Sequence, residues 1–146
     1  MKIAIGCDPN AEEAKKRLID YITREGLGTV TDFGSTDAVY AHVAFSVARA
    51  VADKEYDRGI LLCGTGIGMS IAANKVKGAY AALVSDTYSA KRSRLSNDAN
   101  ILCMGVFTIG DKVREELTTV FIQNDFISGS SSQAKVDAYK EYDAER

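Results

Sequence analysis

A cysteine followed by three closely spaced glycines is the part of this sequence best suited to chemistry. The segment CGTGIG, residues 63–68, follows an apolar run and leads into a stretch of small residues. Gly64, Gly66 and Gly68 allow backbone N–H groups to turn inward, because glycine tolerates positive φ and adds no side-chain bulk. A glycine loop between a strand and a helix forms an anion-binding concavity, which also favours a cysteine thiolate. Cys63 is therefore a candidate catalytic base.

Two hydroxyl side chains accompany the cysteine. Thr65 lies inside the glycine loop and Ser70 lies just after it. Both could donate a hydrogen bond to a developing oxyanion, so the loop could supply an oxyanion hole as well as a base. Two other interpretations stay open at this point. A cysteine at the end of a buried strand is commonly a small packing residue. A generic nucleotide-binding loop is a weaker alternative, because the spacing matches neither the G-x-G-x-x-G fingerprint nor a Walker loop.

Short apolar runs alternate with helical patterns along the chain, which predicts a parallel sheet covered by helices on both faces. The predicted strands cover residues 2–7, 28–34, 58–64, 78–84 and 100–105, and the predicted helices cover residues 11–26, 41–56, 67–75, 87–97, 109–124 and 134–145. Right-handed crossovers then give one three-layer α/β/α, Rossmann-like domain over residues 1–146, doubly wound, with strand order 2-1-3-4-5 and an extra C-terminal helix. Ligands bind such sheets at the carboxyl ends of strands 1 and 3, where Asp8 and Cys63 are expected.

Composition argues against several classes of function. The chain has 18 basic and 20 acidic residues and a formal net charge of −2, which disfavours a nucleic-acid or anionic-membrane partner. The longest apolar stretches have about six residues, far short of the roughly 20 that a membrane span needs. The three cysteines form no C-x-x-C or Cys/His pattern, which favours reduced thiols in a cytoplasmic protein over a disulfide framework or a zinc site. The single histidine, His42, cannot build a metal site by itself.

The segment CGTGIGMSIAANKVKG, residues 63–78, resembles the signature of the ribose-5-phosphate isomerase type B / galactose-6-phosphate isomerase family. The resemblance covers nearly the whole chain. Further matching segments are IAIGCD at 3–8, Tyr40, SDTYSA at 85–90, SNDAN at 96–100 and the strand–Gly–helix at 102–110. The resemblance implies aldose–ketose isomerisation of a phosphorylated sugar, a small-molecule substrate, without a metal or other cofactor.

The resemblance also implies roles for individual residues. Cys63 would move the proton between C1 and C2, and Thr65 with the amides of residues 64–68 would hold the enediolate. The candidate substrate-binding residues are Asp8, Tyr40, Gly64, Gly66, Gly68, Ser70, Asn97 and Lys135. Family sites lie between two subunits, so a homodimer or a dimer of dimers is implied. The last predicted helix, residues 134–145, is expected to dock on the neighbouring subunit.

Several family positions are filled differently in this chain. Pro9 stands where the family has a histidine after the first aspartate, and Ser96 stands where the family has the histidine that opens the sugar ring. The positions of arginines that hold the phosphate are filled by Phe107, Ser131 and Lys135. The base is therefore kept while the ring-opening group and most of the phosphate clamp are replaced.

These differences leave several functions open. A tetrose 4-phosphate needs no ring opening, so D-erythrulose 4-phosphate and D-erythrose 4-phosphate are the preferred substrate pair. Alternatively, the chain is the cysteine-bearing subunit of a heteromer, as in galactose-6-phosphate isomerase, or a ribose-5-phosphate isomerase with a rearranged clamp. A sugar-phosphate sensor on the same sheet is disfavoured because a binding module needs no base. The basic run of Lys91, Arg92 and Arg94 is either a solvated helix face or a replacement phosphate anchor.

Overall fold

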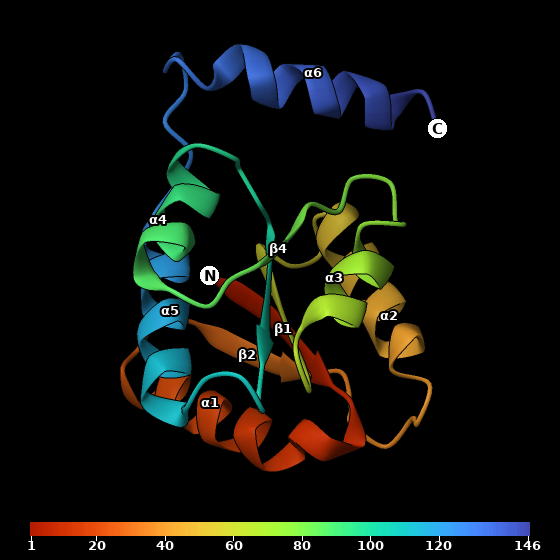
Figure 1. Cartoon of the computed structure of the whole chain (residues 1–146), viewed down its shortest axis with the longest axis vertical. Helices are drawn as coiled ribbons and strands as arrows, with labels where there is room; N and C mark the ends of the chain where they lie inside the picture. The colour runs from red at the N-terminus through yellow and green to blue at the C-terminus, as the bar shows by residue number, and fades with distance from the viewer.

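A five-stranded parallel sheet forms the centre of the structure (Figure 1). The computed structural model describes residues 1–146. The strands are β1 (Lys2–Cys7), β2 (Thr29–Asp32), β3 (Arg58–Cys63), β4 (Ala81–Leu83) and β5 (Ile101–Gly105). The helices are the 3-10 turn η1 (Pro9–Ala11), α1 (Glu12–Arg24), α2 (Tyr40–Ala52), α3 (Ile67–Ala73), α4 (Thr87–Leu95), α5 (Asp111–Gln123) and α6 (Gln133–Ala144). The doubly wound α/β fold is therefore confirmed, and the ends of the elements shift by a few residues.

The order of the last two strands differs from the prediction. The sheet runs β2-β1-β3-β5-β4, so the predicted order 2-1-3-4-5 is wrong at this edge. β5 pairs with β3, from Gly59↔Ile101 to Cys63↔Gly105, whereas β4 pairs only with β5. Every residue of β5 is buried, and all three residues of β4 are at least partly exposed. A fully apolar strand suits the interior of a parallel sheet, and a short strand suits its edge.

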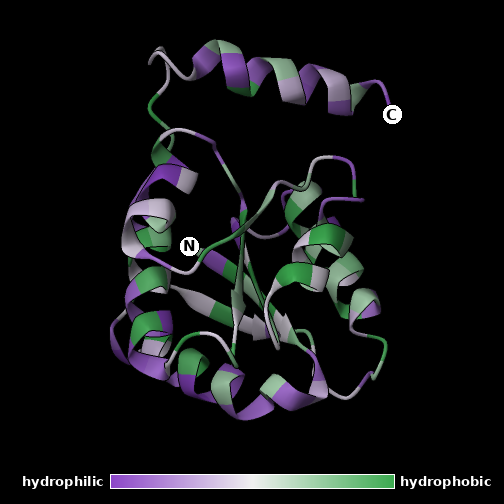
Figure 2. Ribbon diagram, viewed as in Figure 1, coloured by the Kyte–Doolittle hydropathy of each residue, from purple (hydrophilic) through white to green (hydrophobic).

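The strand order also decides which helices share a layer. α2 packs on α3 over one face of the sheet, and α5 packs on both α1 and α4 over the other. The chain moves outward from β3 to β4 and then back to β5, so right-handed crossovers place α3 and α4 on opposite faces. Figure 2 shows hydrophobic residues on the strands and on the sides of the helices that face them. None of the helices is both long enough and apolar enough to cross a membrane.

The C-terminal helix α6 lies apart from both layers, beside the segments that lead into β4 and β5 (Figure 1). The carboxylate of Asp143 accepts hydrogen bonds from the N–H of Gly78 at 2.7 Å and from the hydroxyl of Tyr80 at 2.8 Å. It also pairs with Arg146. Burial acts to raise the pKa of Asp143, but hydrogen bonds from these three partners hold that pKa below its ordinary value. Since Val136 is the only buried hydrophobic residue of α6, polar contacts carry much of its attachment.

Candidate active site

Cys63 ends β3 at the carboxyl edge of the sheet, beside Gly105 of β5. Its side chain is buried, and its Sγ accepts a hydrogen bond from the N–H of Gly66 at 3.1 Å. Gly66 adopts φ +81°, a left-handed conformation that glycine takes without strain. A Cβ at this position would also lie 2.6 Å from Cδ1 of Leu83. The left-handed backbone conformation and the lack of room for a Cβ therefore both require glycine at position 66, where the loop turns back to the sulfur.

The loop between β3 and α3 presents backbone donors next to the thiol. The N–H of Gly66 bonds the thiol, and the N–H of Ile67 donates to Oγ1 of Thr65 at 3.3 Å. No hydrogen bond within the chain uses the N–H groups of Gly64, Thr65 or Gly68 as donors. Free amides at the start of a helix attract negative charge. The loop can therefore hold an oxyanion beside a sulfur atom.

Two aromatic side chains border the loop. Tyr40, the first residue of α2, packs against Gly68 so closely that a Cβ there would lie 1.8 Å from the tyrosine oxygen. Phe107 packs its ring against Gly64, where a Cβ would lie 2.9 Å from Cδ2 of the ring. The N–H of Phe107 also donates to the carbonyl oxygen of Gly64 at 2.9 Å, although its side chain is mostly exposed. The structure thus brings Tyr40 to the loop, where its binding role stays a prediction, and places Phe107 at the rim.

Asp8 lies at the same edge of the sheet, directly after β1. Its N–H donates to the carbonyl oxygen of Leu62 at 3.1 Å, which places Asp8 next to the end of β3. Its carboxylate accepts the N–H of Ala11 at 3.1 Å and thereby caps η1. The candidate residues that gather at this edge are Cys63, Gly64, Thr65, Gly66, Gly68, Ser70, Asp8 and Tyr40.

The other two cysteines are packing residues. Cys7 and Cys103 are fully buried in the sheet. Burial raises the pKa of the Cys7 thiol to about 12 and raises the pKa of the Cys103 thiol as well. Both thiols therefore stay protonated near neutral pH and are poor nucleophiles or bases.

Asn97 and Lys135 lie at the opposite end of the sheet from Cys63. Asn97 precedes β5, which begins beside Gly59 of β3. The four steps along β3 from Gly59 to Cys63 span about 13 Å at roughly 3.3 Å per residue. Lys135 is in the first turn of α6, four residues before Tyr139, whose hydroxyl donates to the carbonyl oxygen of Asn97. One copy of the chain therefore does not bring Asn97 or Lys135 to its own thiol.

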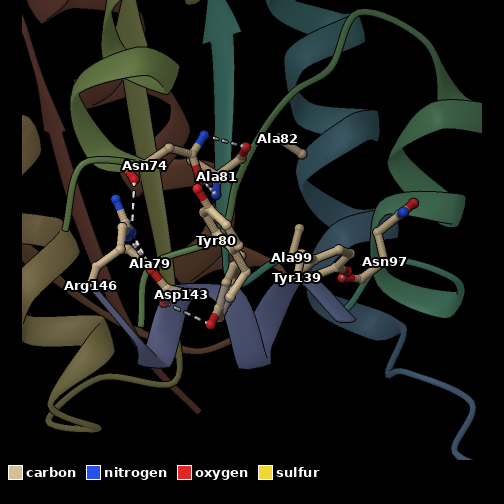
Figure 3. A pocket seen from close by; sticks show the side chains of 11 residues that line it. Asn74, Ala79, Tyr80, Ala81, Ala82, Asn97, Ala99, Tyr139, Asp143 and Arg146 are labelled. Atoms are coloured by element: carbon tan, nitrogen blue, oxygen red, sulfur yellow. Dashed lines mark hydrogen bonds and ion pairs between the residues drawn. The ribbon is translucent and has the colours of Figure 1, made fainter. Parts of the chain in front are cut away.

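A groove of about 530 Å³ lies between α6 and the edge strand β4 (Figure 3). Its lining residues are Asn74, Ala79, Tyr80, Ala81, Ala82, Asn97, Ala99, Tyr139, Tyr142, Asp143 and Arg146. Asn74 covers the outer edge of β4, because its side-chain amide donates to the carbonyl oxygen of Ala81 at 3.0 Å and accepts the N–H of Ala81 at 2.8 Å. The sequence did not single out Asn74, although it lies within the family signature. The groove is separate from the cysteine loop.

Comparison with known proteins identifies the family. A family model described as Ribose/Galactose Isomerase matches residues 3–139. The chain belongs to this family. It is 48% identical over 146 residues to ribose-5-P isomerase B of Listeria innocua, covering 98% of this chain and 97% of that protein. It is 43% identical over 136 residues to D-erythrulose-4-phosphate isomerase of Pectobacterium atrosepticum, covering 90% of this chain and 89% of the relative. The solved type B ribose 5-phosphate isomerase of Trypanosoma cruzi matches with a TM-score of 0.92 and 39% identity over 100% of both chains.

Membership in the ribose/galactose isomerase family makes the chain an aldose–ketose isomerase of phosphorylated sugars. Such a reaction moves a proton between two adjacent carbons and needs a stabilised enediolate. The carboxyl edge of the sheet offers one sulfur and three free amides for these tasks. The single histidine is not part of this group, because the His42 side chain faces solvent and its Nδ1 lies 2.8 Å from Oδ2 of Asp37. No three His, Cys, Asp or Glu side chains gather closely enough to hold a metal ion.

Proposed function

We propose that this isomerase interconverts D-erythrulose 4-phosphate and D-erythrose 4-phosphate, with Cys63 as the base. The Cys63 thiolate takes a proton from C1 of the ketose, and the electron pair of that C–H bond moves into the C1–C2 double bond of an enediolate. The charge on the C2 oxygen is held by the amides of the glycine loop. The thiol then returns the proton to C2, and a proton passes from the C1 oxygen to the C2 oxygen through the solvent, which leaves the aldose and regenerates the thiolate. The observation that supports this role most directly is the Gly66 N–H, which donates to the Cys63 sulfur at 3.1 Å.

The choice of a four-carbon substrate is supported by the side chain at position 96. Ser96 offers a hydroxyl, which is a poor acid–base group near neutral pH, where an imidazole would be needed to open a ring. In a tetrose 4-phosphate, the oxygen that would close a five-membered ring is esterified, so the substrate is already open. The Pectobacterium relative is named for this substrate. Ribose 5-phosphate is the second candidate, because the Listeria relative is named for it.

A site shared between two copies of the chain accounts for the positions of the candidate residues. Asn97 and Lys135 lie at the end of the sheet opposite Cys63, so a second copy must supply them to each thiol. α3 carries Ile67 and Ile71, which are 51% and 58% exposed and lie one turn apart on the same helix face. We propose that this face enters the groove beneath α6 of the second copy, giving a homodimer or a dimer of dimers.

The first experiment measures turnover of the purified chain with D-erythrulose 4-phosphate and with D-ribose 5-phosphate. We expect a higher kcat/KM for the tetrulose phosphate. Cys63→Ala should lower kcat by roughly 10²- to 10⁴-fold, the usual contribution of an acid–base group. Cys7→Ala removes another buried thiol at a strand end and should retain turnover. Faster turnover of ribose 5-phosphate would favour the second candidate, and no turnover of either would point to a missing partner subunit or to a sensor.

Mixing two inactive variants tests the shared site. Cys63→Ala and Lys135→Ala chains each lack a different half of every site. If sites are shared, a mixed dimer contains one site with both defects and one intact site, so mixing and refolding should restore activity. Activity that stays at the level of the separate variants would contradict a site built from two copies.

A further inference from the structure

Arg92, in the last turn of α4, carries a charge that no carboxylate of the chain neutralises. Its Nε donates to Oγ of Ser96 at 2.7 Å, and its Nη2 donates to the same oxygen. Arg92 takes part in none of the ion pairs of the structure. Its side chain is only partly exposed, and a charge withdrawn from water ordinarily has a counter-charge. Ser96 is a neutral acceptor: its hydroxyl oxygen holds the guanidinium in place but does not neutralise its positive charge.

The uncompensated charge lies close to two candidate substrate-binding residues. The N–H groups of Ser96 and Asn97 both donate to the carbonyl oxygen of Arg92, at 2.9 and 3.2 Å, so these three residues form one tight turn. Tyr139 of α6 donates to the carbonyl oxygen of Asn97. Lys135 precedes Tyr139 by one helical turn and shares its face of α6, and it too has no ion-pair partner. Arg92 and Lys135, two cations without an ion-pair partner, thus each lie within about one helical turn of the contact between Tyr139 and Asn97.

The nearest carboxylate does not cancel these charges. Asp98 follows Asn97 directly, but its two oxygens are engaged by Arg94 at 3.2 Å and by Lys140 at 2.6 Å. Arg94 is buried and fixed by further bonds to carbonyl oxygens of the chain. Arg92 near the end of α4 and Lys135 near the start of α6 thus remain available to an anion from outside the chain.

We propose that Arg92, positioned by Ser96, binds the phosphate group of the substrate together with Lys135, in the site completed by Cys63 of the second copy. This inference rests on the proposed function. The planar guanidinium keeps N–H donors free of Ser96, and such a group suits two oxygens of a phosphate, whereas lysine contributes a point charge. Ser96 is a positioning residue: it orients the guanidinium and does not itself transfer a proton. This arrangement places the phosphate beside position 96, which fits a short, open-chain sugar phosphate.

Steady-state kinetics with phosphorylated and unphosphorylated D-erythrulose test the proposal. Arg92→Leu should raise KM for D-erythrulose 4-phosphate by roughly 10- to 100-fold, the effect of losing a charge-assisted hydrogen bond. It should leave kcat/KM for unphosphorylated D-erythrulose within about twofold of the wild type. The KM of Arg92→Lys for D-erythrulose 4-phosphate should lie between the values of the wild type and of Arg92→Leu, since lysine keeps the charge and loses the planar donors. Ser96→Ala should raise KM for the phosphorylated substrate by roughly threefold to tenfold.

Lys91→Leu is the matched control. Lys91 is exposed, lies next to Arg92 on the same helix and carries the same charge. Its loss should change KM for D-erythrulose 4-phosphate less than about twofold if the effect of Arg92 is specific rather than a general loss of positive charge. Equal effects of the two variants would overturn the proposal. So would an Arg92→Leu variant that loses activity equally on both substrates, because that result assigns Arg92 to the stability of the α4 terminus.

Calorimetric titration with inorganic phosphate separates this proposal from the proposed function, because it needs no turnover. The wild-type chain should bind phosphate, and Arg92→Leu should weaken that binding by the same factor as KM, with size-exclusion elution unchanged. If the wild type converts neither sugar phosphate but binds inorganic phosphate, and Arg92→Leu loses that binding, the anion site is supported and the proposed reaction is contradicted. If the wild type is active and Arg92→Leu alters neither KM nor phosphate binding, the proposed role of Arg92 is wrong and the proposed isomerase function is unaffected. A wild-type chain that binds no inorganic phosphate overturns the anion site.

Discussion

Removing the charge of Asp143 should loosen α6 from the rest of the domain. The carboxylate accepts the N–H of Gly78 at 2.7 Å and the hydroxyl of Tyr80 at 2.8 Å, and it pairs with Arg146. Hydrogen bonds to a charged group contribute about 1.5–3 kcal/mol each. In Asp143→Asn, the amide keeps one acceptor oxygen and turns its NH₂ toward another donor, so part of this interaction survives. Since Asp143 is only 5% exposed, little of the loss is screened by water, and we expect the free energy of unfolding to fall by ~2–3 kcal/mol.

Thermal and urea unfolding measure this loss. For a chain of this length, ~2–3 kcal/mol corresponds to a fall in Tm of about 4–12 °C. Asp137→Asn is the matched control on the same helix, because Asp137 is exposed and accepts only a side-chain hydrogen bond from Gln133 at 2.8 Å. That variant should stay within about 0.5 kcal/mol of the wild type. Equal effects of the two substitutions would refute the assignment of Asp143 as the anchor of α6.

The pH dependence of the difference between wild type and Asp143→Asn gives a second check. The pKa of Asp143 is lowered in the folded chain because its hydrogen bonds outweigh burial, which acts to raise it. A carboxylate with a lowered pKa stabilises the fold fully above its unfolded value of about 3.9 and loses this contribution as pH falls through the folded value. The stability difference should therefore be constant at neutral pH and shrink below about pH 4. A difference that grows on acidification would contradict the lowered pKa.

Two further predictions concern the cysteine loop and the thiols. Gly66→Ala should destabilise the chain by ~2 kcal/mol or more in urea unfolding and lower kcat, because it combines strain at φ +81° with a Cβ 2.6 Å from Leu83 Cδ1; wild-type stability would show that the left-handed turn is dispensable. A small disulfide reagent at pH 8 should modify Cys63 before the other two thiols, because Cys63 retains 5% exposure whereas Cys7 and Cys103 are fully buried and burial raises the pKa of both. Peptide mass spectrometry that finds either buried cysteine labelled before unfolding would contradict this expectation.

Local patterns were enough to predict the elements and the core of the cysteine loop. The alternation of apolar runs and helical patterns predicts all five strands and their helices, because side-chain periodicity reflects neighbours only a few residues away. The loop from Cys63 to Gly68 is equally local, since its turn is made by contiguous residues. The hydrogen bonds between Arg92 and Ser96 also join residues one helical turn apart. Such features follow from backbone geometry and from the identity of adjacent side chains.

The order of the strands and the neighbours of the site depend on residues far apart in the sequence, so only the tertiary structure decided them. An apolar run shows that a strand is buried but not which strand lies beside it, so the exchange of β4 and β5 could not be read from periodicity. That exchange brings Phe107 against Gly64, because β5 and not β4 adjoins the end of β3. The docking of α6 beside Asn97, through the hydroxyl of Tyr139, places Lys135 away from Cys63 of its own chain. The sequence by itself therefore determined the cysteine–glycine loop that presents Cys63, because that loop is made by contiguous residues, whereas only the packing of strands and helices decided which groups can reach it.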